Sequence, residues 1–229
     1  IMERQLDGRA SQLLRHSIEQ KGIQIITEAN TEALIGDKNG HVKQIRLKDG
    51  TVLDADLVVF AVGIRPNIAL AQSAGLRCNR GVLVNDTMQT FDPSIYAVGE
   101  CIEHRGQTFG LVEPLWGQAF ICATHLAEHG SLTFKAPTVP TQLKVSGVDV
   151  FSAGNFEPKD DYEDIILNDE KRQIYKRIII QNDRVIGAVL FGDTEDGMWY
   201  AELIADQTPV SSFRNKLLFG RDFALKNAG

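Results

Sequence analysis

The sequence of 229 residues carries 24 Lys and Arg against 30 Asp and Glu, for a formal net charge of −6 and a pI near 5.4. Nucleic-acid-binding proteins usually carry an excess of basic residues, so this acidic balance excludes that class of protein. With 43% hydrophobic residues and no run of about 18 apolar residues, the composition is that of a globular chain without a membrane span. The three cysteines, at 78, 101 and 122, form no CxxC pair, which favours a reducing cytoplasm and argues against zinc or iron–sulfur sites in this chain.

Periodicity and turn residues predict alternating helices and strands in the first two thirds of the chain. Asp7 is a helix N-cap residue, and Gly22 is a helix terminator. Residues 57–62 are continuously apolar, which is typical of a strand buried on both faces. In chain order we expect a helix between Asp7 and Gly22, strands over 23–27, 32–37, 41–47 and 57–62, a short helix over 67–74, strands over 81–86 and 95–98, and a helix over 114–128.

The pattern changes after residue 135. The stretch FKAPTVPTQ (134–142) has two prolines in four residues, which favours a linker. Beyond it we expect strands over 144–154, 163–168, 173–181 and 184–192, followed by two helices. Strands first and helices afterwards predict a separate α+β domain, with an antiparallel sheet and its helices on one side.

The glycine spacing limits what this chain contains. No two of the 20 glycines lie two positions apart, so there is no GxGxxG motif. A complete dinucleotide-binding unit uses these glycines to bring backbone close to a pyrophosphate at a helix N-terminus. The sequence also lacks the GxSxG elbow of hydrolases.

Three further features each allow two interpretations. Residues 125–129 match H-x-x-E-H, an inverted zinc-protease pattern, but His125 and His129 are also suited to the negative end of a helix before Gly130. Because no third ligand is apparent, we expect no metal site. Arg65 is either a phosphate clamp or a surface turn residue, and its spacing favours the turn. Trp116 either stacks on a ligand or fills the core beside Phe120, and spacing alone favours the core.

Three stretches occur in a telling order: DADLVVFAVGIRPN (54–67), IYAVGEC (95–101) and GLVEPLWGQA (110–119). Together they resemble the pyridine nucleotide-disulphide oxidoreductase family of flavoproteins, in the branch without a redox disulfide. IMERQLD (1–7) and LKVSGVDVFSAG (143–154) are similar in particular to the flavin region of the large subunits of NAD(P)H-dependent nitrite reductases. The resemblance covers essentially the whole chain. It implies an α/β fold class, with partial FAD- and NAD(P)-binding doubly wound domains followed by a smaller α+β C-terminal domain.

The resemblance also implies site residues. In the family, the acid that ends the second stretch binds the ribityl–phosphate region of FAD, which assigns this role to Gly99 and Glu100. Glu stands where the family usually has Asp, so its carboxylate lies one methylene farther out. The third stretch opens a helix beside the flavin ring. By the same resemblance, the cofactor-binding residues at the ring are Glu113, Pro114, Leu115 and Trp116, and Val62 and Gly63 lie on the NAD(P)H side.

In the family, both glycine motifs precede the region that this chain matches, so we expect the chain to be part of a longer protein. Residues 1–66 are then the C-terminal part of the NAD(P)H-binding domain, 67–135 the returning segment of the FAD-binding domain, and 136–229 the C-terminal α+β domain. By itself, the chain is expected to retain no FAD and to oxidise no NAD(P)H. A homodimer formed through bare sheet edges is a further expectation.

The function implied is a cytoplasmic oxidoreductase in which electrons pass from NAD(P)H through FAD to a metal-centre acceptor. In a nitrite reductase, iron–sulfur and siroheme modules outside this chain would be that acceptor. We name no catalytic acid or base, because hydride transfer is the cofactor's chemistry. One alternative is a rubredoxin- or ferredoxin-type reductase, whose acceptor is a separate protein. An alternative from another class is a non-catalytic interaction or dimerisation module that works through 137–229.

Overall fold

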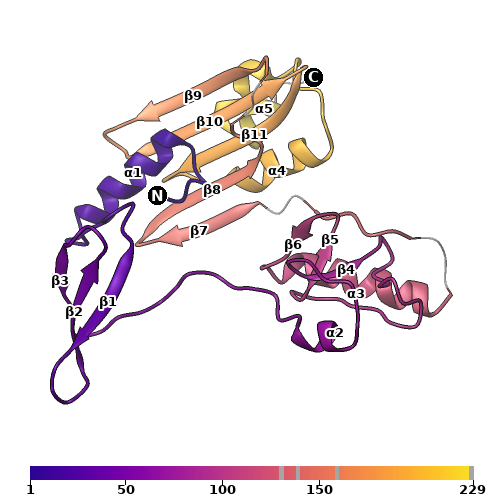
Figure 1. Ribbon diagram of the computed structural model, residues 1–229. Coiled ribbons are helices and arrows are strands. Elements are labelled where there is room, and N and C mark those ends of the chain that lie inside the picture. Colours follow the sequence, from indigo (N-terminus) through magenta and orange to yellow (C-terminus); the bar gives the residue numbers. More distant parts are fainter. Residues whose placement is uncertain (129–131, 138–139, 158–159, 227–229) are drawn as a thin grey trace. The chain divides into compact units, whose positions relative to one another are not determined.

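The computed structural model describes residues 1–128, 132–137, 140–157 and 160–226 (Figure 1). The chain divides into two compact units by its internal contacts. Unit 1 comprises Ile1–Leu57 together with Pro140–Gly229, and unit 2 comprises Val58–Val139. Among the described residues, no helix has both the length and the apolar character needed to cross a bilayer.

Unit 1 is built on a five-stranded sheet. Its strands are β7 (Thr141–Val145), β8 (Val148–Gly154), β9 (Glu163–Asp169), β10 (Ile174–Gln181) and β11 (Arg184–Phe191). They lie in the order β7-β8-β11-β10-β9, and every neighbouring pair is antiparallel. Asn182 and Asp183 both have positive φ and form the two-residue turn between β10 and β11. The antiparallel sheet predicted for this region is therefore confirmed.

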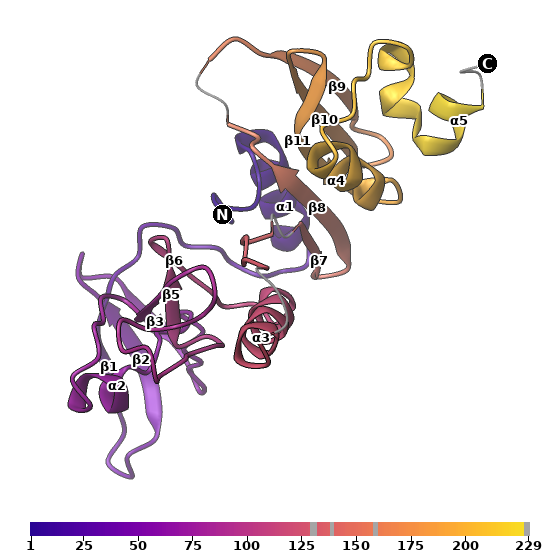
Figure 2. The ribbon, with the colours of Figure 1, turned by 90° about the vertical axis from the view of Figure 1, so that its right-hand side faces the viewer.

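Both faces of this sheet are covered (Figure 2). Phe151, Ile178 and Leu190 pack against the helices that follow the sheet, which are α4 (Gly197–Ala205), η1 (Arg214–Phe219) and α5 (Arg221–Leu225). The alternate residues Val150 and Val189 pack instead against α1 (Gly8–Glu19). The sequence predicted helices on one side only. Because the central strands are apolar on both faces, the second face also needs cover, and α1 supplies it.

The start of α1 is tied to the sheet by a buried carboxylate. Asp7 caps the helix as predicted, with its Oδ1 accepting the Ala10 N–H at 2.9 Å. Its Oδ2 accepts the Tyr175 hydroxyl at 2.8 Å and Arg177 Nη1 at 3.2 Å. Arg177 also makes a two-pronged ion pair with Asp164, at 2.9 and 3.0 Å. One charged network thus joins α1, β9 and β10.

A small hairpin sheet completes unit 1. Its strands β1 (Thr31–Gly36), β2 (Val42–Leu47) and β3 (Val52–Asp54) are antiparallel, and β1 and β2 confirm the strands predicted over 32–37 and 41–47. The strand predicted over 23–27 is wrong, because this segment runs as irregular chain. Ile25 is partly buried against the core at α1, whereas Ile23 and Ile26 are exposed. Of the isoleucines in this segment, only Ile25 therefore contributes to the core.

Unit 2 has a mixed sheet and two helices. Strands β4 (Val82–Val84) and β5 (Ile102–His104) are parallel, and β6 (Gln107–Thr108) joins β5 as an antiparallel neighbour. The helices are α2 (Ala69–Ser73) and α3 (Glu113–Leu126). Its core is formed by Met88, Ile102, Phe109, Ile121, Cys122 and Phe134. The mixture of helices and sheets is the α/β architecture that the sequence predicts.

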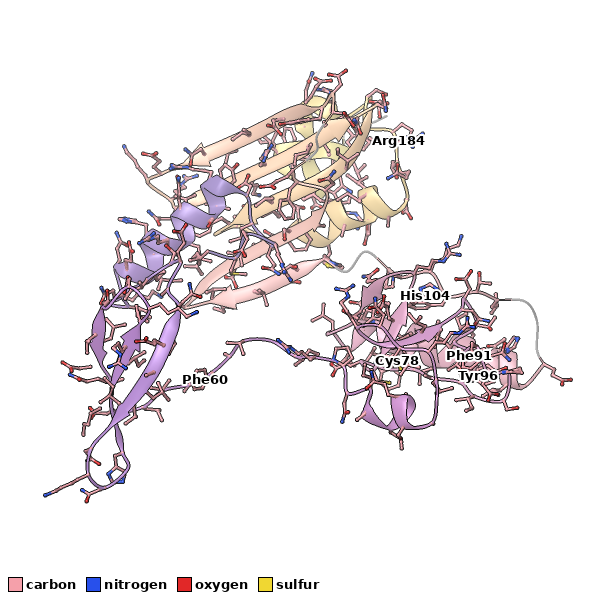
Figure 3. All side chains as sticks on the ribbon, in the orientation of Figure 1. Phe60, Cys78, Phe91, Tyr96, His104 and Arg184 are labelled. Atoms are coloured by element: carbon pink, nitrogen blue, oxygen red, sulfur yellow. The ribbon has the colours of Figure 1, made fainter. Side chains whose placement is uncertain are left out.

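Two strands predicted in unit 2 are wrong. Residues 57–62 run as irregular chain, and Figure 3 shows the side chain of Phe60, which is 65% exposed, on this extended segment. Residues 95–98 make one isolated bridge, between Tyr96 and Gln89. An apolar run becomes a buried strand only where other strands and helices flank it. The described residues do not flank 57–62 in this way. Residues 95–97 do pair with 88–90, but this pairing is limited to a single bridge.

Candidate functional site

The Gly99 turn lies at the end of residues 95–98 in unit 2. The Ala97 N–H donates to the Met88 carbonyl at 3.0 Å, which holds this segment against the core. Gly99 has φ +102°, a backbone conformation that favours glycine. Among the described residues, no atom lies within 4 Å of the position that a Cβ would take at Gly99. One side of this turn is therefore open to a ligand.

Glu100 follows in the same turn, and its side chain is exposed. The turn is closed by the Ile102 N–H, which donates to the Gly99 carbonyl at 3.4 Å, a long hydrogen bond. The Glu100 carboxylate is thus an accessible acceptor beside an open glycine. This chemistry suits the hydroxyl groups of a sugar alcohol.

Gln118 of α3 connects this turn to the helix. It is fully buried, and its Oε1 accepts the Gly99 N–H at 2.7 Å. The structure therefore brings the Gly99 turn and α3 together, two of the three stretches that carry the family resemblance. The sequence analysis missed Gln118. Its signal was a polar residue one helical turn after Pro114, on a helix that is otherwise mainly apolar.

The first turn of α3 presents a different face from the one predicted. Pro114 is buried, whereas Trp116 is 74% exposed and Phe120 is also exposed. The prediction that spacing places Trp116 and Phe120 in the core is therefore wrong. The buried face is formed by Pro114, Gln118, Ile121 and Cys122. Because α3 is apolar on most sides, periodicity alone does not identify the side that packs.

The start of α3 has no side-chain cap. Its N-cap is Val112, whose side chain has no hydrogen-bonding atom. The Leu115 N–H donates to the Val112 carbonyl at 3.0 Å. N–H groups in a first helical turn lack intrahelical carbonyl partners and carry a partial positive charge. Glu113, which is exposed, stands beside them.

The residues predicted on the NAD(P)H side lie apart from this packed arrangement. Val62 is 88% exposed, and Gly63 has φ +83° on the same irregular segment. The hydrogen bonds of the described residues join Gly99 to α3 but include neither Val62 nor Gly63. Arg65 is exposed on this segment too.

A second polar cluster in unit 2 was not predicted. His104, which is labelled in Figure 3, is buried in β5. Its Nε2 lies 2.8 Å from Asp86 Oδ1. Arg105 donates to both oxygens of Asp86, at 2.9 and 2.6 Å. Phe134 packs edge-on against the His104 ring, and its N–H donates to the Asp86 carbonyl at 2.8 Å. These partners are far apart in sequence, so no local pattern signals them.

This cluster predicts acid sensitivity in unit 2. Hydrogen bonds from Arg105 and then His104 hold the pKa of Asp86 well below its ordinary value. A carboxyl whose folded pKa is lowered contributes stability above its unfolded pKa of about 3.9, and this contribution is lost as the pH falls through the folded pKa. We therefore expect Asp86→Asn to speed amide exchange in β4, β5 and β6 at pH 7, and this effect to shrink at the lowest pH.

The measurement is hydrogen exchange, read by mass spectrometry on peptides covering 79–110 and repeated between pH 7 and pH 2.5 with correction for intrinsic exchange rates. Asp160→Asn, at an exposed carboxylate of unit 1, is the matched control. An equal effect of Asp86→Asn at every pH would contradict the assigned role of the carboxylate charge.

The H-x-x-E-H segment is described only in part. His125 lies with its Nδ1 at 2.8 Å from the Tyr96 hydroxyl, at the end of α3. His129 and Gly130 lie outside the described residues. Within the described part of the chain, no group of three or more His, Cys, Asp or Glu side chains is arranged to hold a metal ion.

The residues at the Gly99 turn fit a flavin. The turn offers an open glycine and an accessible carboxylate, and α3 offers a first turn with an exposed indole. Among the described residues, Gln118 Nε2 is a buried side-chain nitrogen without a hydrogen-bond partner. A buried polar donor without a partner is rare in folded proteins, so Gln118 is not explained by core packing alone.

Two family models match the chain. Residues 1–119 match the family described as pyridine nucleotide-disulphide oxidoreductase, and residues 140–208 match the rubredoxin NAD+ reductase C-terminal domain. Since the first match spans more than half of its length, the chain belongs to the pyridine nucleotide-disulphide oxidoreductase family.

Similar proteins include two from Bacillus subtilis (strain 168). One is a nitrite reductase [NAD(P)H], 46% identical over 92% of this chain and 26% of the relative. The other is an assimilatory nitrate reductase electron transfer subunit, 39% identical over 95% of this chain and 28% of the relative. The nitrite reductase (NADH) large subunit of Escherichia coli (strain K12) is 36% identical over 86% of this chain and 24% of the relative. The chain thus spans about a quarter of the length of these curated relatives.

Solved structures share the fold. A covalent putidaredoxin reductase–putidaredoxin complex aligns with a TM-score of 0.79 at 25% identity, over 100% of this chain and 55% of that chain. The NADH:rubredoxin oxidoreductase from Clostridium acetobutylicum aligns with a TM-score of 0.68 at 24% identity, over 99% of this chain and 54% of that chain.

Proposed function

We propose that this chain is part of a flavin-dependent oxidoreductase that passes electrons from NAD(P)H through FAD to a metal-centre acceptor, as part of a nitrite reductase large subunit. The observation that carries the proposal is the hydrogen bond from Gly99 to Gln118. It joins the turn with the exposed Glu100 carboxylate to α3, which supports a single cofactor site formed by two separate stretches. The relatives named nitrite reductase supply the protein class.

Each residue has a stated part in this site. Glu100 accepts hydrogen bonds from the ribityl hydroxyls of FAD. Gly99, which has no side chain, lets the ribityl group approach the protein backbone. Glu113, Pro114 and Leu115 form a helix start whose positive dipole end favours negative charge at the flavin ring, and Trp116 walls the ring. Val62 and Gly63 lie on the NAD(P)H side. When bound, FAD accepts a hydride and releases its electrons singly.

We further propose the domain boundaries 1–66, 67–135 and 136–229 for the NAD(P)H, FAD and C-terminal parts, and a role in nitrate assimilation in the cytoplasm. Iron–sulfur and siroheme centres lie outside this chain in this proposal. A homodimer through exposed sheet edges belongs to it as well. A second candidate is a rubredoxin- or ferredoxin-type reductase, which the match of residues 140–208 to a rubredoxin reductase domain favours.

The test uses the full-length protein. We expect a flavin absorbance spectrum that bleaches on anaerobic addition of NADH or NADPH. Nitrite should reoxidise the flavin only if the nitrite reductase assignment holds, and reduced rubredoxin should form instead for the second candidate. Absence of bound flavin after incubation with FAD would favour the non-catalytic module.

Glu100→Gln tests the site itself. Losing a charged acceptor of hydrogen bonds is expected to weaken FAD binding about tenfold or more, since such bonds contribute about 1.5–3 kcal/mol. Glu195→Gln, at an exposed glutamate of unit 1, is the control and should bind FAD normally. Equal affinity in both variants would remove Glu100 from the site.

A further inference from the structure

Gln118 is an unusual residue for its position. It lies on the buried face of α3 beside Pro114, Ile121 and Cys122, and its side chain is 0% exposed. A helix position selected only for packing favours an apolar side chain of this size, because a buried amide must satisfy its polar atoms. Gln118 satisfies one of them, through the Gly99 N–H.

The orientation of its amide is fixed by that contact. Gly99 N is a donor, so the Gln118 atom facing it at 2.7 Å has to be the carbonyl Oε1. This leaves Nε2 on the other side, where no described residue accepts a hydrogen bond from it. The Nε2 group of this amide is thus buried without a partner, which is unfavourable. The bond that Oε1 makes to the Gly99 N–H has to offset this cost, which points to a role for this bond in the Gly99 turn.

The hydrogen bonds of the Gly99 turn indicate this role. The backbone closes the turn through the Ile102 N–H and the Gly99 carbonyl, which are 3.4 Å apart and hence weakly bonded. The bond from Gly99 to Gln118 is 0.7 Å shorter by these two distances, 3.4 and 2.7 Å. The side chain of α3, rather than the turn's own backbone bond, is the stronger restraint on Gly99. It acts one residue before Glu100.

We propose that Gln118 is a positioning residue for flavin binding. Its Oε1 holds the Gly99 N–H, keeps Gly99 at φ +102°, and thereby aims Glu100 at the cofactor. The inference rests on the proposed flavin site but adds a residue that does not itself touch the reacting atoms. It predicts that Gln118 and Gly99 act as one unit, because the first works only through the second.

The experiment measures the FAD dissociation constant of the full-length apoprotein by quenching of flavin fluorescence. Gln118→Met removes both polar atoms at nearly constant size, and we expect it to raise the dissociation constant at least tenfold. Gly99→Ala puts a side chain where φ is strongly positive, and we expect a similar loss. Gln72→Met, at an exposed position of α2, is the matched control and should change binding less than twofold.

A double-mutant cycle separates positioning from general damage. If Gln118 acts through Gly99, the double variant binds FAD within about twofold of the weaker single variant. Losses that multiply instead would overturn the proposal. The thermal midpoint of the apoprotein should move only a few degrees in Gln118→Met, because the lost hydrogen bond is offset by removal of an unpaired buried amide.

The two proposals fail in different ways. A wild-type protein that binds no FAD defeats the proposed function and this inference with it. A wild-type protein that binds FAD, together with Gln118→Met that binds it equally well, defeats this inference alone. If Gln118→Met does not fold, Gly99→Ala decides: binding within twofold of wild type shows that the restraint on this turn has no effect on the flavin.

Discussion

Replacing Gly187 with Ala is expected to destabilise the five-stranded sheet of unit 1 by about 3 kcal/mol or more. Strand β11 carries a bulge at Ile186, because its pairing with β10 skips that residue. The chain of Asn155 folds over Gly187 at this point, and a Cβ on Gly187 would lie 2.2 Å from the Asn155 carbonyl oxygen. A clash with backbone is not relieved by a change of rotamer, so the strands have to separate.

The measurement is denaturant unfolding followed by tryptophan fluorescence. The sequence has two tryptophans, and Trp116→Phe leaves Trp199, which is buried against this sheet, as the reporter. Gly8→Ala in the first turn of α1 is the matched control, because a Cβ there meets no described atom within 4 Å. We expect the control to change stability by less than about 1 kcal/mol. A similarly small effect of Gly187→Ala would show that the bulge rearranges freely.

Features with local causes could be predicted from the sequence. Asp7 caps α1 with its own side chain, three residues from the N–H that it accepts. Asn182 and Asp183 form a turn because both tolerate positive φ. The hairpin of β1 and β2 follows from an alternating pattern on either side of Gly40. In each case the atoms that decide the structure lie within a few residues of each other.

Features that depend on residues far apart in the sequence could not be predicted from it. Residues 57–62 have the composition of a buried strand. A strand also needs neighbouring strands, and the sequence of this segment does not show whether they are present. The covering of the β8–β11 face by α1 joins Leu14 to Val150 and Val189, which follow it by 136 and 175 residues, a pairing that no spacing rule specifies. The His104–Asp86 contact likewise joins β5 to a loop 18 residues earlier.

The candidate site shows the same division. Gly99 and Glu100 stand out because a glycine followed by an acid ends an apolar run, and the family resemblance then gives them a role. Gln118 carries no such local signal, since its importance lies in a contact 19 residues away. Spacing predicts that Trp116 lies in the core, but a helix that is apolar on most sides offers several faces, and packing selects one.

The charged network at the start of α1 leads to the second large effect. Arg177 is 13% exposed and is shared by Asp7 and Asp164. Arg177→Met removes the cation and leaves two carboxylates facing an apolar side chain, one of them almost fully buried. Breaking a buried ion pair by removing one partner costs about 3–5 kcal/mol, so we expect a loss of about 3 kcal/mol or more.

Tyr175 does not rescue this loss. Its hydroxyl already donates to Asp7, and burial together with the Asp7 charge raises the pKa of Tyr175 above its ordinary value. The hydroxyl therefore stays neutral at pH 7 and contributes one hydrogen bond to Asp7 in either variant. Only Arg177 supplies positive charge to Asp7 among the ion pairs of the described residues.

Unfolding of Arg177→Met is again followed through Trp199 in the Trp116→Phe background. Arg172→Met is the matched control, because Arg172 is 79% exposed and lies 3.8 Å from Asp169 in a surface pair. Such pairs contribute about 0–1 kcal/mol, so the control should unfold almost as the parent does. If both variants lose equally little stability, the packing of α1 on the sheet holds this region together, and the ion pairs contribute little to its stability. If Arg177→Met alone loses stability, the ion network is what holds the start of α1 against β10.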